Sequence, residues 1–260
     1  MSKFDTLIID IESYVYQACT SCKTIVPMEK GEKNKFVEIY DLRLGQEYIN
    51  NIIQQFKDKF ICGSVVLVIG DKNNNFRKGL NPMYKSARGS KPLMYDKLID
   101  WMVGEHNVVS LPTLEADDIC RIVYEDDDNF KGEKLIITID KDFYSVPCNL
   151  YRDNPKDRVV VQVTDTDARL NEFVQVVMGD KTDGYSGIPN FGEKKARDFI
   201  TLTTTWEDIV KLYIANKTTE EEAIMNYNMA HIVGKDDYDI KTYKVKPRTL
   251  PKAEAKEDKK

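Results

Sequence analysis

The sequence contains only two histidines, His106 and His231, and its five cysteines are an odd number in a chain of 260 residues. An odd count in a chain this long argues against the disulfide framework of a secreted domain. Cys19 and Cys22 have the spacing of a metal or redox pair, but no second cysteine pair completes a zinc site. Reduced structural thiols are therefore expected, and no histidine–cysteine pair competes as a catalytic nucleophile.

Long apolar runs are also absent. No segment approaches the length of a membrane span, and the first residues lack a basic stretch followed by an apolar core. We therefore expect no signal peptide, no membrane partner and a cytoplasmic location. A hydrophobic content of 42% and a charged content of 31% indicate a globular chain, organised as one large domain or one domain with a helical annex.

The chain has no excess of positive charge, because its formal net charge is −5. This value argues mildly against a nucleic-acid partner, but acids that are clustered to bind metal ions change the local field. The distribution of the bases is more informative than their sum. Residues 72–91 contain several lysines and arginines and no acid.

Residues 114–119 read Leu-Glu-Ala-Asp-Asp-Ile, which places three carboxylates within four residues at the start of an amphipathic run. Adjacent like charges repel, so a folded protein rarely gains from this arrangement. A divalent cation reverses the argument, because hard cations bind oxygen ligands. A helix N-terminus that favours acids near its dipole is the alternative for this motif alone.

Apolar strand patterns alternate with helical periodicity before residue 168. Strands are expected over 4–9, 64–70, 107–110, 134–139 and 159–163, and helices over 13–20, 48–60, 92–103 and 116–124. This alternation predicts a parallel α/β sheet. Residues 23–36 are polar and lysine-rich and are expected to form a loop.

An aspartate directly follows each of three apolar strands, at Asp10, Asp71 and Asp140. In parallel sheets, ligands bind outside the carboxyl ends of the strands. One such aspartate alone is usually a turn residue or a helix cap. Three at equivalent positions, together with the acids of 114–119, predict a carboxylate site.

The composition changes near residue 169, and helices are expected over 170–178, 193–202, 206–215 and 220–233. The first two enclose a pair of acids and a glycine-rich turn, and the second carries Lys194, Lys195 and Arg197. Helix N-terminal amides with nearby bases can bind phosphate. An ordinary hairpin with a solvated basic face is the alternative.

These motifs together resemble those of the 5′-nuclease (flap endonuclease-like) family, and most closely those of the compact 5′→3′ exonucleases of short-tailed phages. Order and spacing agree from Ile9-Asp10 to about Tyr243. The matching motifs are Gly70-Asp71 with Phe76-Arg77-Lys78, Pro82-x-Tyr84-Lys85-x-x-Arg88, residues 114–118, Asp140-Lys141-Asp142 and Gly179-Asp180-x-x-Asp183-Gly184-Tyr185-Ser186-Gly187-Ile188.

The resemblance implies a parallel-sheet core of the PIN type over 1–168, with a basic arch segment over 72–92. A helical helix–turn–helix subdomain that binds DNA would follow over 169–245. The charged stretch 246–260 has almost no large apolar residues and is expected to be disordered.

The resemblance also implies two divalent ions, Mg²⁺ or Mn²⁺, and K⁺ held by main-chain carbonyls of the 184–192 turn. The ligands of the first ion would be Asp10, Asp71, Glu115 and Asp117. Those of the second would be Asp117, Asp140, Asp142, Asp180 and Asp183, with Asp118 supporting. Some of these ligands would act through water, because Mg²⁺ releases its waters reluctantly.

Basic and aromatic residues complete the implied site. If their segment is helical, Lys85 and Arg88 lie one turn apart and can grip one phosphate; in the family, their counterparts act on the scissile phosphate. A solvated basic helix face is the alternative. Tyr84 is a candidate for stacking on a terminal base and could equally pack inward. Further DNA contacts are expected from Arg77, Lys78, Gly187, Gly192, Lys194, Lys195 and Arg197.

Three functions follow for comparison. The first is a two-metal-ion 5′→3′ exonuclease of phage replication, acting as a monomer near replication-fork proteins on duplex DNA and on RNA primers in RNA/DNA hybrids, with RNase H activity. The second is a structure-specific 5′ flap endonuclease, and the third is an inactive nucleic-acid-binding module. Only 26 residues separate Arg88 from Glu115, which is short for an arch that threads a free strand. This favours the first function, and the intact acids argue against the third.

Overall fold

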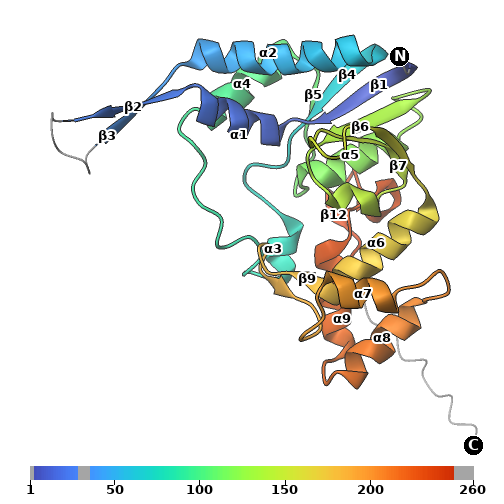
Figure 1. Cartoon of the computed structure of the whole chain (residues 1–260). Helices are drawn as coiled ribbons and strands as arrows, with labels where there is room; N and C mark the ends of the chain where they lie inside the picture. The colour runs from blue at the N-terminus through green and yellow to red at the C-terminus, as the bar shows by residue number, and fades with distance from the viewer. Residues whose placement is uncertain (1–2, 29–35, 249–260) are drawn as a thin grey trace, which may run out of the picture.

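The computed structural model describes residues 3–28 and 36–248. Its centre is a six-stranded sheet with the order β5-β4-β1-β6-β7-β8 (Figure 1). The strands are β1 (Lys3–Asp10), β4 (Ile61–Val68), β5 (Val108–Val109), β6 (Lys134–Thr138), β7 (Cys148–Arg152) and β8 (Val160–Val163). All neighbouring pairs are parallel except β7 and β8, which are antiparallel. The predicted parallel α/β core is confirmed.

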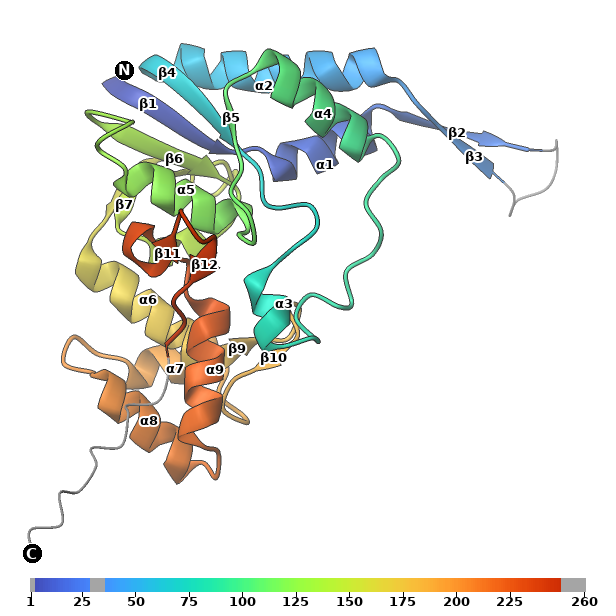
Figure 2. The same ribbon diagram turned by 180° about the vertical axis from the view of Figure 1, so that it is seen from behind.

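Both faces of this sheet are covered by helices. They are α1 (Glu12–Ser21), α2 (Leu42–Lys59), α4 (Tyr95–Glu105) and α5 (Ala116–Glu125). In β1, Leu7 and Ile9 pack into the core beneath α1, α2 and α4, whereas Ile8 packs into the core that contains α5. Figures 1 and 2 show the two layers. Burial on both faces explains why the strand is an uninterrupted apolar run.

The parallel register brings three strand ends to one edge of the sheet. Asp10 pairs with Val68, and Ile9 pairs with Ile137. The chain leaves β4 through Gly70, where an added Cβ would lie 3.1 Å from the nitrogen of Ala116. Glycine therefore lets the end of β4 approach the start of α5 closely, where the predicted acids lie.

The second unit is helical and contains α6 (Asp165–Met178), α7 (Glu193–Phe199), α8 (Trp206–Ala215) and α9 (Glu220–Ala230), with the hairpin of β9 (Gly179–Asp180) and β10 (Tyr185–Ser186). Threonines cap three of these helices. Thr164, Thr205 and Thr219 each accept the backbone N–H three residues on, and the acid there reaches back to the threonine. These reciprocal bonds explain where α6, α8 and α9 begin.

The domain boundaries differ from those predicted. Helix α6 begins at Asp165, so a division at 168 would cut its first turn. Ile232, Val233 and Tyr238 return to the core beneath α5, and β11 (Tyr238–Asp239) pairs with β12 (Lys244–Val245) beside it. The helical unit therefore ends before residue 232, and residues 232–245 pack with the sheet.

The prediction of a loop over 23–36 is wrong for the residues of this stretch that the structure describes, 23–28 and 36. The strands β2 (Lys23–Pro27) and β3 (Phe36–Tyr40) form an antiparallel hairpin that projects from the body (Figures 1 and 2). Val26 faces Val37, and Thr24 faces Ile39. The high lysine content of 23–36 hid these β-branched pairs, which favour strands. Strand β7 was also not predicted.

The tail expected to be disordered over 246–260 begins with ordered residues. The side chain of Asn228 accepts from the nitrogen of Arg248 at 2.7 Å and donates to its carbonyl oxygen at 2.9 Å. The guanidinium of Arg248 lies 4.2 Å from the ring centre of Trp206. Arg248 therefore packs on the helical unit, and residues 249–260 lie outside the described residues.

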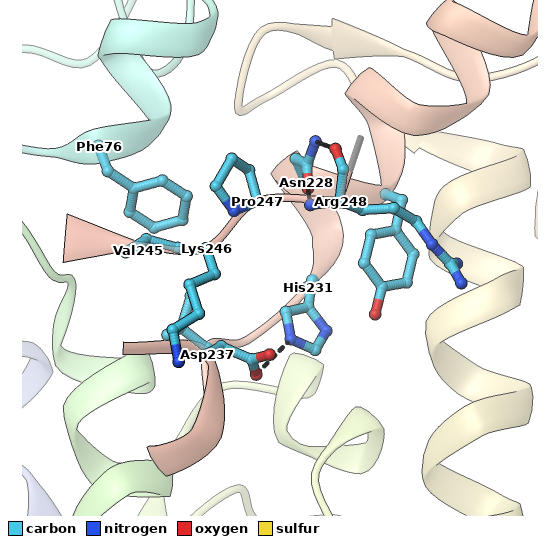
Figure 3. A pocket seen from close by; sticks show the side chains of 10 residues that line it. Phe76, Asn228, His231, Asp237, Val245, Lys246, Pro247 and Arg248 are labelled. Atoms are coloured by element: carbon cyan, nitrogen blue, oxygen red, sulfur yellow. Dashed lines mark hydrogen bonds and ion pairs between the residues drawn. The ribbon is translucent and has the colours of Figure 1, made fainter. Parts of the chain in front are cut away.

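A cavity of about 240 Å³ lies where α9 meets this C-terminal segment (Figure 3). His231 bridges two acids here, with Nδ1 2.5 Å from Glu172 and Nε2 3.0 Å from Asp237. Burial opposes the charged imidazolium, but the bonds to Asp237 and Glu172 outweigh it and raise the pKa of His231 to about 9. The cationic form therefore joins α6 to the segment after α9.

The free energy of unfolding should consequently fall as pH rises from about 6.5 to 9. Because the pKa of His231 is raised in the folded state, the protonated imidazole stabilises the fold fully below the pKa of the unfolded state. This stabilisation is lost as pH rises through the pKa of the folded state. Urea unfolding of His231→Gln should show a flatter slope in this window and a loss on the order of 2 kcal/mol at pH 6.5. His106→Gln is the control, because burial lowers the pKa of His106 and moves its titration below the window. Equal slopes in the two variants would contradict the assignment.

Candidate active site

A cavity of about 230 Å³ opens at the carboxyl edge of the sheet. It receives acids from the ends of β1 and β6 and from the start of α5, and two bases from the segment between α3 (Phe76–Leu80) and α4. The lining residues are Asp10, Glu12, Ser13, Tyr16, Lys85, Arg88, Glu115, Ala116, Asp117 and Asp140. The structure thus brings together much of the predicted site.

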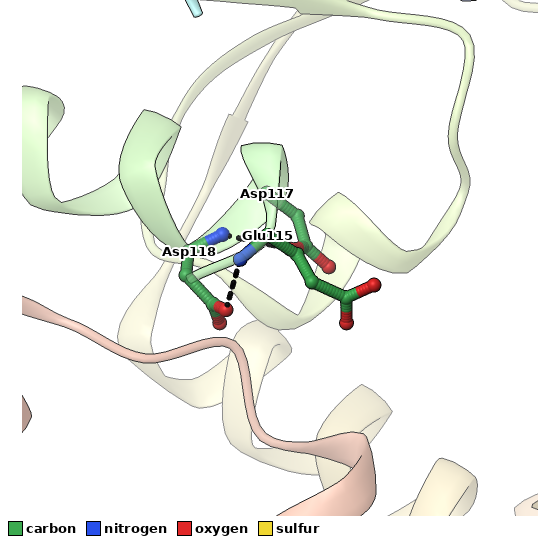
Figure 4. Close-up of side chains that lie close together, drawn as sticks. All are labelled: Glu115, Asp117 and Asp118. Atoms are coloured by element: carbon green, nitrogen blue, oxygen red, sulfur yellow. Dashed lines mark hydrogen bonds between the residues drawn. The ribbon is translucent and has the colours of Figure 1, made fainter. Parts of the chain in front are cut away.

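The start of α5 holds two carboxylates of opposite character (Figure 4). Glu115 accepts from Arg77 at 3.0 Å, from Tyr84 at 2.8 Å and from Lys85. Burial opposes its charge, but Arg77 and Lys85 lower the pKa of Glu115 to about 2. Burial, Asp118 and Glu115 instead raise the pKa of Asp117 well above its usual range. The negative charge of Glu115 is therefore balanced by bases. The negative charge of Asp117 is instead destabilised by burial and by the neighbouring acids.

Asp118 points to the other side of the helix start in Figure 4. It is fully buried, and its two oxygens pair with Arg77, each at 2.8 Å. They also accept from the nitrogens of Val233 at 2.8 Å and Glu115 at 3.1 Å. Although the acids at 115, 117 and 118 lie within 4.8 Å of one another, these contacts occupy Asp118. Support of the helix start, rather than direct metal ligation, is the role that fits.

Two predicted DNA contacts are corrected. The side chain of Arg77 is 1% exposed and also donates to the carbonyl oxygens of Met229 and His231 at 3.2 and 2.6 Å. Tyr84 is 3% exposed, and its ring packs into the core of the helical unit. Neither side chain can reach a nucleotide, because both are needed to hold Glu115. Lys78 is exposed on α3, and its phosphate contact stays a prediction.

Asp71 behaves largely as a turn residue. One oxygen accepts from the nitrogen of Thr113 at 2.8 Å, and the other accepts from Asn73 at 2.8 Å and Asn74 at 3.2 Å. Burial raises its pKa, but these backbone bonds outweigh burial and lower the pKa of Asp71. Asp71 thus fixes the residues that lead into Glu115, and it is not among the lining residues of the cavity.

The remaining acids repel one another. Asp10 accepts from the hydroxyl of Thr138 at 2.9 Å, yet burial and the neighbouring Glu12 raise the pKa of Asp10 to about 7. Burial and Asp140 raise the pKa of Asp142 to about 6, with Asp180 and Asp183 contributing. Every donor here is a carboxylate oxygen, and a divalent cation would relieve the repulsion. The residues therefore fit hard metal ions such as Mg²⁺ or Mn²⁺.

The segment that carries Lys85 and Arg88 is not a helix. It runs through successive turns, and Lys85 has a φ of +53°. The predicted spacing of one helical turn is therefore wrong, but the two bases still converge. Arg88 lies 2.7 Å from Asp183, and Lys85 contacts Glu115 and lies 3.7 Å from Asp183.

Glu12 and Tyr16 line the cavity and were missed in the sequence. Glu12 accepts from the hydroxyl of Tyr95 at 2.9 Å, and Tyr16 is 40% exposed with its ring 4.8 Å from that of Tyr95. Helix α1 begins at Glu12, two residues after Asp10, so Glu12 and Tyr16 lie on its first two turns. The spacing of Glu12 and Tyr16 from Asp10 was the sequence signal that could have identified them as site residues.

The glycine-rich turn borders a separate cavity of about 700 Å³, whose lining includes Gly187 and Gly192. Lys194, Lys195 and Arg197 are exposed on α7 beyond it. The Nζ of Lys195 lies 3.8 Å from the ring centre of Phe191. The structure thus places these bases away from the carboxylate cavity.

Curated proteins and solved structures resemble the chain. No protein-family model matches the chain. The exodeoxyribonuclease of Enterobacteria phage T3 is 26% identical over 192 residues, which are 72% of this chain and 63% of that protein. The exonuclease of Escherichia phage T7 is 27% identical over 202 residues, which are 75% and 66% of the two chains.

A solved structure of the phage T5 D15 protein with metal ions matches with a TM-score of 0.65 and 14% identity, over 87% of this chain and 88% of that one. The chain resembles the 5′-nucleases in sequence and in fold. It spans just under two thirds of the length of its T3 and T7 relatives. None of the helices in the described part of the chain has the length and apolar character to cross a membrane.

Proposed function

We propose that this protein is a metal-dependent 5′→3′ exonuclease of the 5′-nuclease family that degrades duplex DNA from 5′ ends and removes RNA primers from RNA/DNA hybrids. The observation that carries the proposal is the cavity where acids of β1, α5 and β6 face Lys85 and Arg88. Its phage relatives are named exonucleases. The protein would act as a monomer in the cytoplasm of a phage-infected cell and meet replication-fork proteins there.

Two divalent ions would be held entirely by oxygen ligands. Asp10, Glu115 and Asp117 would hold the first, with Asp71 acting through water. Asp117, Asp140, Asp142, Asp180 and Asp183 would hold the second. When bound, such a pair supplies an activated water and stabilises the leaving 3′-oxygen of a phosphodiester.

The bases of this chain would act on the phosphate itself. Lys85 and Arg88 line the cavity together with Asp10, and their charges would stabilise the phosphate as negative charge develops on it. The exposed ring of Tyr16 offers a surface for the terminal base, in place of the buried Tyr84. Duplex backbone would lie across the 184–192 turn, with K⁺ bound by main-chain carbonyls there, and such contacts carry little sequence preference.

A 5′ flap endonuclease is the second candidate. The phage T5 D15 flap endonuclease, solved with DNA and metal ions, matches with a TM-score of 0.61 and 15% identity over 87% of this chain and 88% of that one. The short segment between Arg88 and Glu115 favours the exonuclease, because a threaded flap needs a longer arch. An inactive binding module would have no use for mutually repelling acids.

A nuclease assay tests the proposal. Duplex DNA and an RNA/DNA hybrid, each labelled at a 5′ end, are incubated with Mg²⁺, with Mn²⁺ or with chelator. Mononucleotides released only with metal are the expected products, and longer fragments from a flapped substrate would point to the endonuclease. Binding of duplex without cleavage in either metal would overturn the enzyme assignment.

The basic helix α7 should contribute to binding and not to chemistry. Lys194→Ala/Lys195→Ala should weaken binding equally on all duplex sequences and flatten the log–log salt dependence by about one unit per lost phosphate contact. Fluorescence anisotropy with Ca²⁺ replacing Mg²⁺ measures both effects. Lys57→Ala/Lys131→Ala is the control, because these exposed lysines lie near the opposite edge of the sheet. An unchanged salt slope would make the α7 lysines merely solvated charges.

A further inference from the structure

The segment 81–88 is held in place by the β9–β10 hairpin of the helical unit. Both views show α3 and the chain after it beside this hairpin (Figures 1 and 2). The main-chain nitrogen of Lys85 donates to the carbonyl oxygen of Asp183 at 2.8 Å. The side chain of Asn81 donates to the carbonyl oxygen of Gly184 at 3.5 Å and accepts from the nitrogen of Met83 at 3.0 Å. Backbone contacts therefore fix this segment at residues 183 and 184.

Gly184 is the residue that permits the contact. Its φ is +82°, a conformation that residues with a side chain rarely adopt. A Cβ at this position would overlap the carbonyl oxygen of Met83 and lie 3.7 Å from the nitrogen of Lys85. The two backbones can approach this closely only because residue 184 has no side chain.

The same contact sets the direction of the two bases. Tyr84 is anchored between Met83 and Lys85 by its bond to Glu115 at 2.8 Å. Lys85 has a positive φ of its own, so its Nζ turns back toward Glu115 and Asp183. A shift of the backbone at 83–85 would move both Nζ of Lys85 and the guanidinium of Arg88.

We propose that Gly184 is a positioning residue for Lys85 and Arg88, through which the helical unit sets the place of the cations that meet the reacting phosphate. The hairpin that contains Gly184 continues directly into the 187–192 turn, where duplex DNA would lie. The position of the 187–192 turn and the positions of Lys85 and Arg88 are thereby linked through one backbone contact. The catalytic part of this inference rests on the proposed nuclease function, whereas the structural part does not.

Kinetics test the catalytic part. Gly184→Ala should lower the rate at saturating duplex on the order of 10- to 100-fold, because small misplacements of a reacting group have effects of this size. KM should change little. Gly79→Ala is the matched control, since a Cβ there meets nothing within 4 Å. In a Lys85→Ala/Arg88→Ala background, Gly184→Ala should cost almost nothing further, because the groups it positions are gone. An equal loss in that background would overturn the proposal.

Amide exchange tests the structural part without any cleavage. In the metal-free protein, Gly184→Ala should speed exchange in peptides covering 81–88 and leave peptides from β1 unchanged. Asn81→Ala is a milder second variant that loosens the same contact without a new Cβ, and it should move both measurements in the same direction. Unchanged exchange in both variants would overturn the proposal. A protein without nuclease activity that still shows the exchange effect would refute the proposed function and keep the role of Gly184 in placing the segment.

Discussion

Asp117→Ala should abolish metal-dependent cleavage and leave the affinity for duplex DNA within about twofold, since the proposed DNA contacts lie elsewhere and no base is removed. Asp117 faces the cavity beside Glu115 and is the carboxylate that would serve both ions. Its loss removes a ligand from each. Cleavage of labelled duplex and anisotropy with Ca²⁺ are the two measurements, and near wild-type turnover in Mg²⁺ would sink the assignment.

The same variant should be more stable than the wild type when metal is removed. Burial and two neighbouring acids raise the pKa of Asp117, so its ionised form destabilises the native state. An acid whose pKa is raised in the native state lowers the stability of the protein as pH rises above the pKa of the unfolded state, near 4. At pH 7, urea unfolding of the metal-free variant should therefore show a gain on the order of 1 kcal/mol or more. Glu105→Ala is the control, because Glu105 is an exposed acid at the end of α4.

Lys85→Met should lower the cleavage rate at saturating DNA on the order of 10²–10³-fold, the usual effect of losing one electrostatic donor. The same change should raise the affinity of the free protein for Ca²⁺ or Mn²⁺. Lys85 contacts Glu115 and lies 3.7 Å from Asp183, so its ammonium competes with a metal ion for these oxygens. Methionine keeps most of the length of the unbranched side chain and removes the charge.

Calorimetric titration of the metal-free protein measures the second effect. We expect metal affinity to rise roughly tenfold, which corresponds to about 1.4 kcal/mol of relieved competition. Arg88→Met should act in the same direction through Asp183, with a smaller effect because its side chain is 58% exposed. Lys78→Met is the control on exposed α3. A fall in metal affinity would mean that Lys85 organises Glu115 for the ion and does not compete with it.

The sheet and its acids could be predicted because their signals are local. A β-branched run that ends in aspartate specifies both the strand of β4 and the edge at which Asp71 lies. The parallel register then places Asp10 and the residues after β6 at the same edge without further information. The fold class and the general position of the cavity follow from these runs.

The environment of individual side chains depended on distant partners. Arg77 belongs to a segment of bases that looks exposed, and only its pairing with Asp118, 41 positions away, explains its burial. The conformation of Lys85 depends on a backbone contact with Asp183, which no local pattern around Lys85 specifies. Asp71 follows an apolar run in the sequence as Asp10 does. In the structure, however, its carboxylate accepts a hydrogen bond from the nitrogen of Thr113, which gives Asp71 a structural role. Residue type was sufficient to find these positions and insufficient to assign their roles.

The contacts of Arg77 have a consequence for synthesis of the protein. Its guanidinium joins the acids at the start of α5 to carbonyl oxygens at the end of α9. Asp118 also accepts a hydrogen bond from the nitrogen of Val233. A chain growing on the ribosome acquires Glu115, Asp117 and Asp118 more than 110 residues before Met229, His231 and Val233. A chain that stops before residue 229 therefore carries these acids without the carbonyl oxygens and the main-chain nitrogen that hold Arg77 and Asp118 in place.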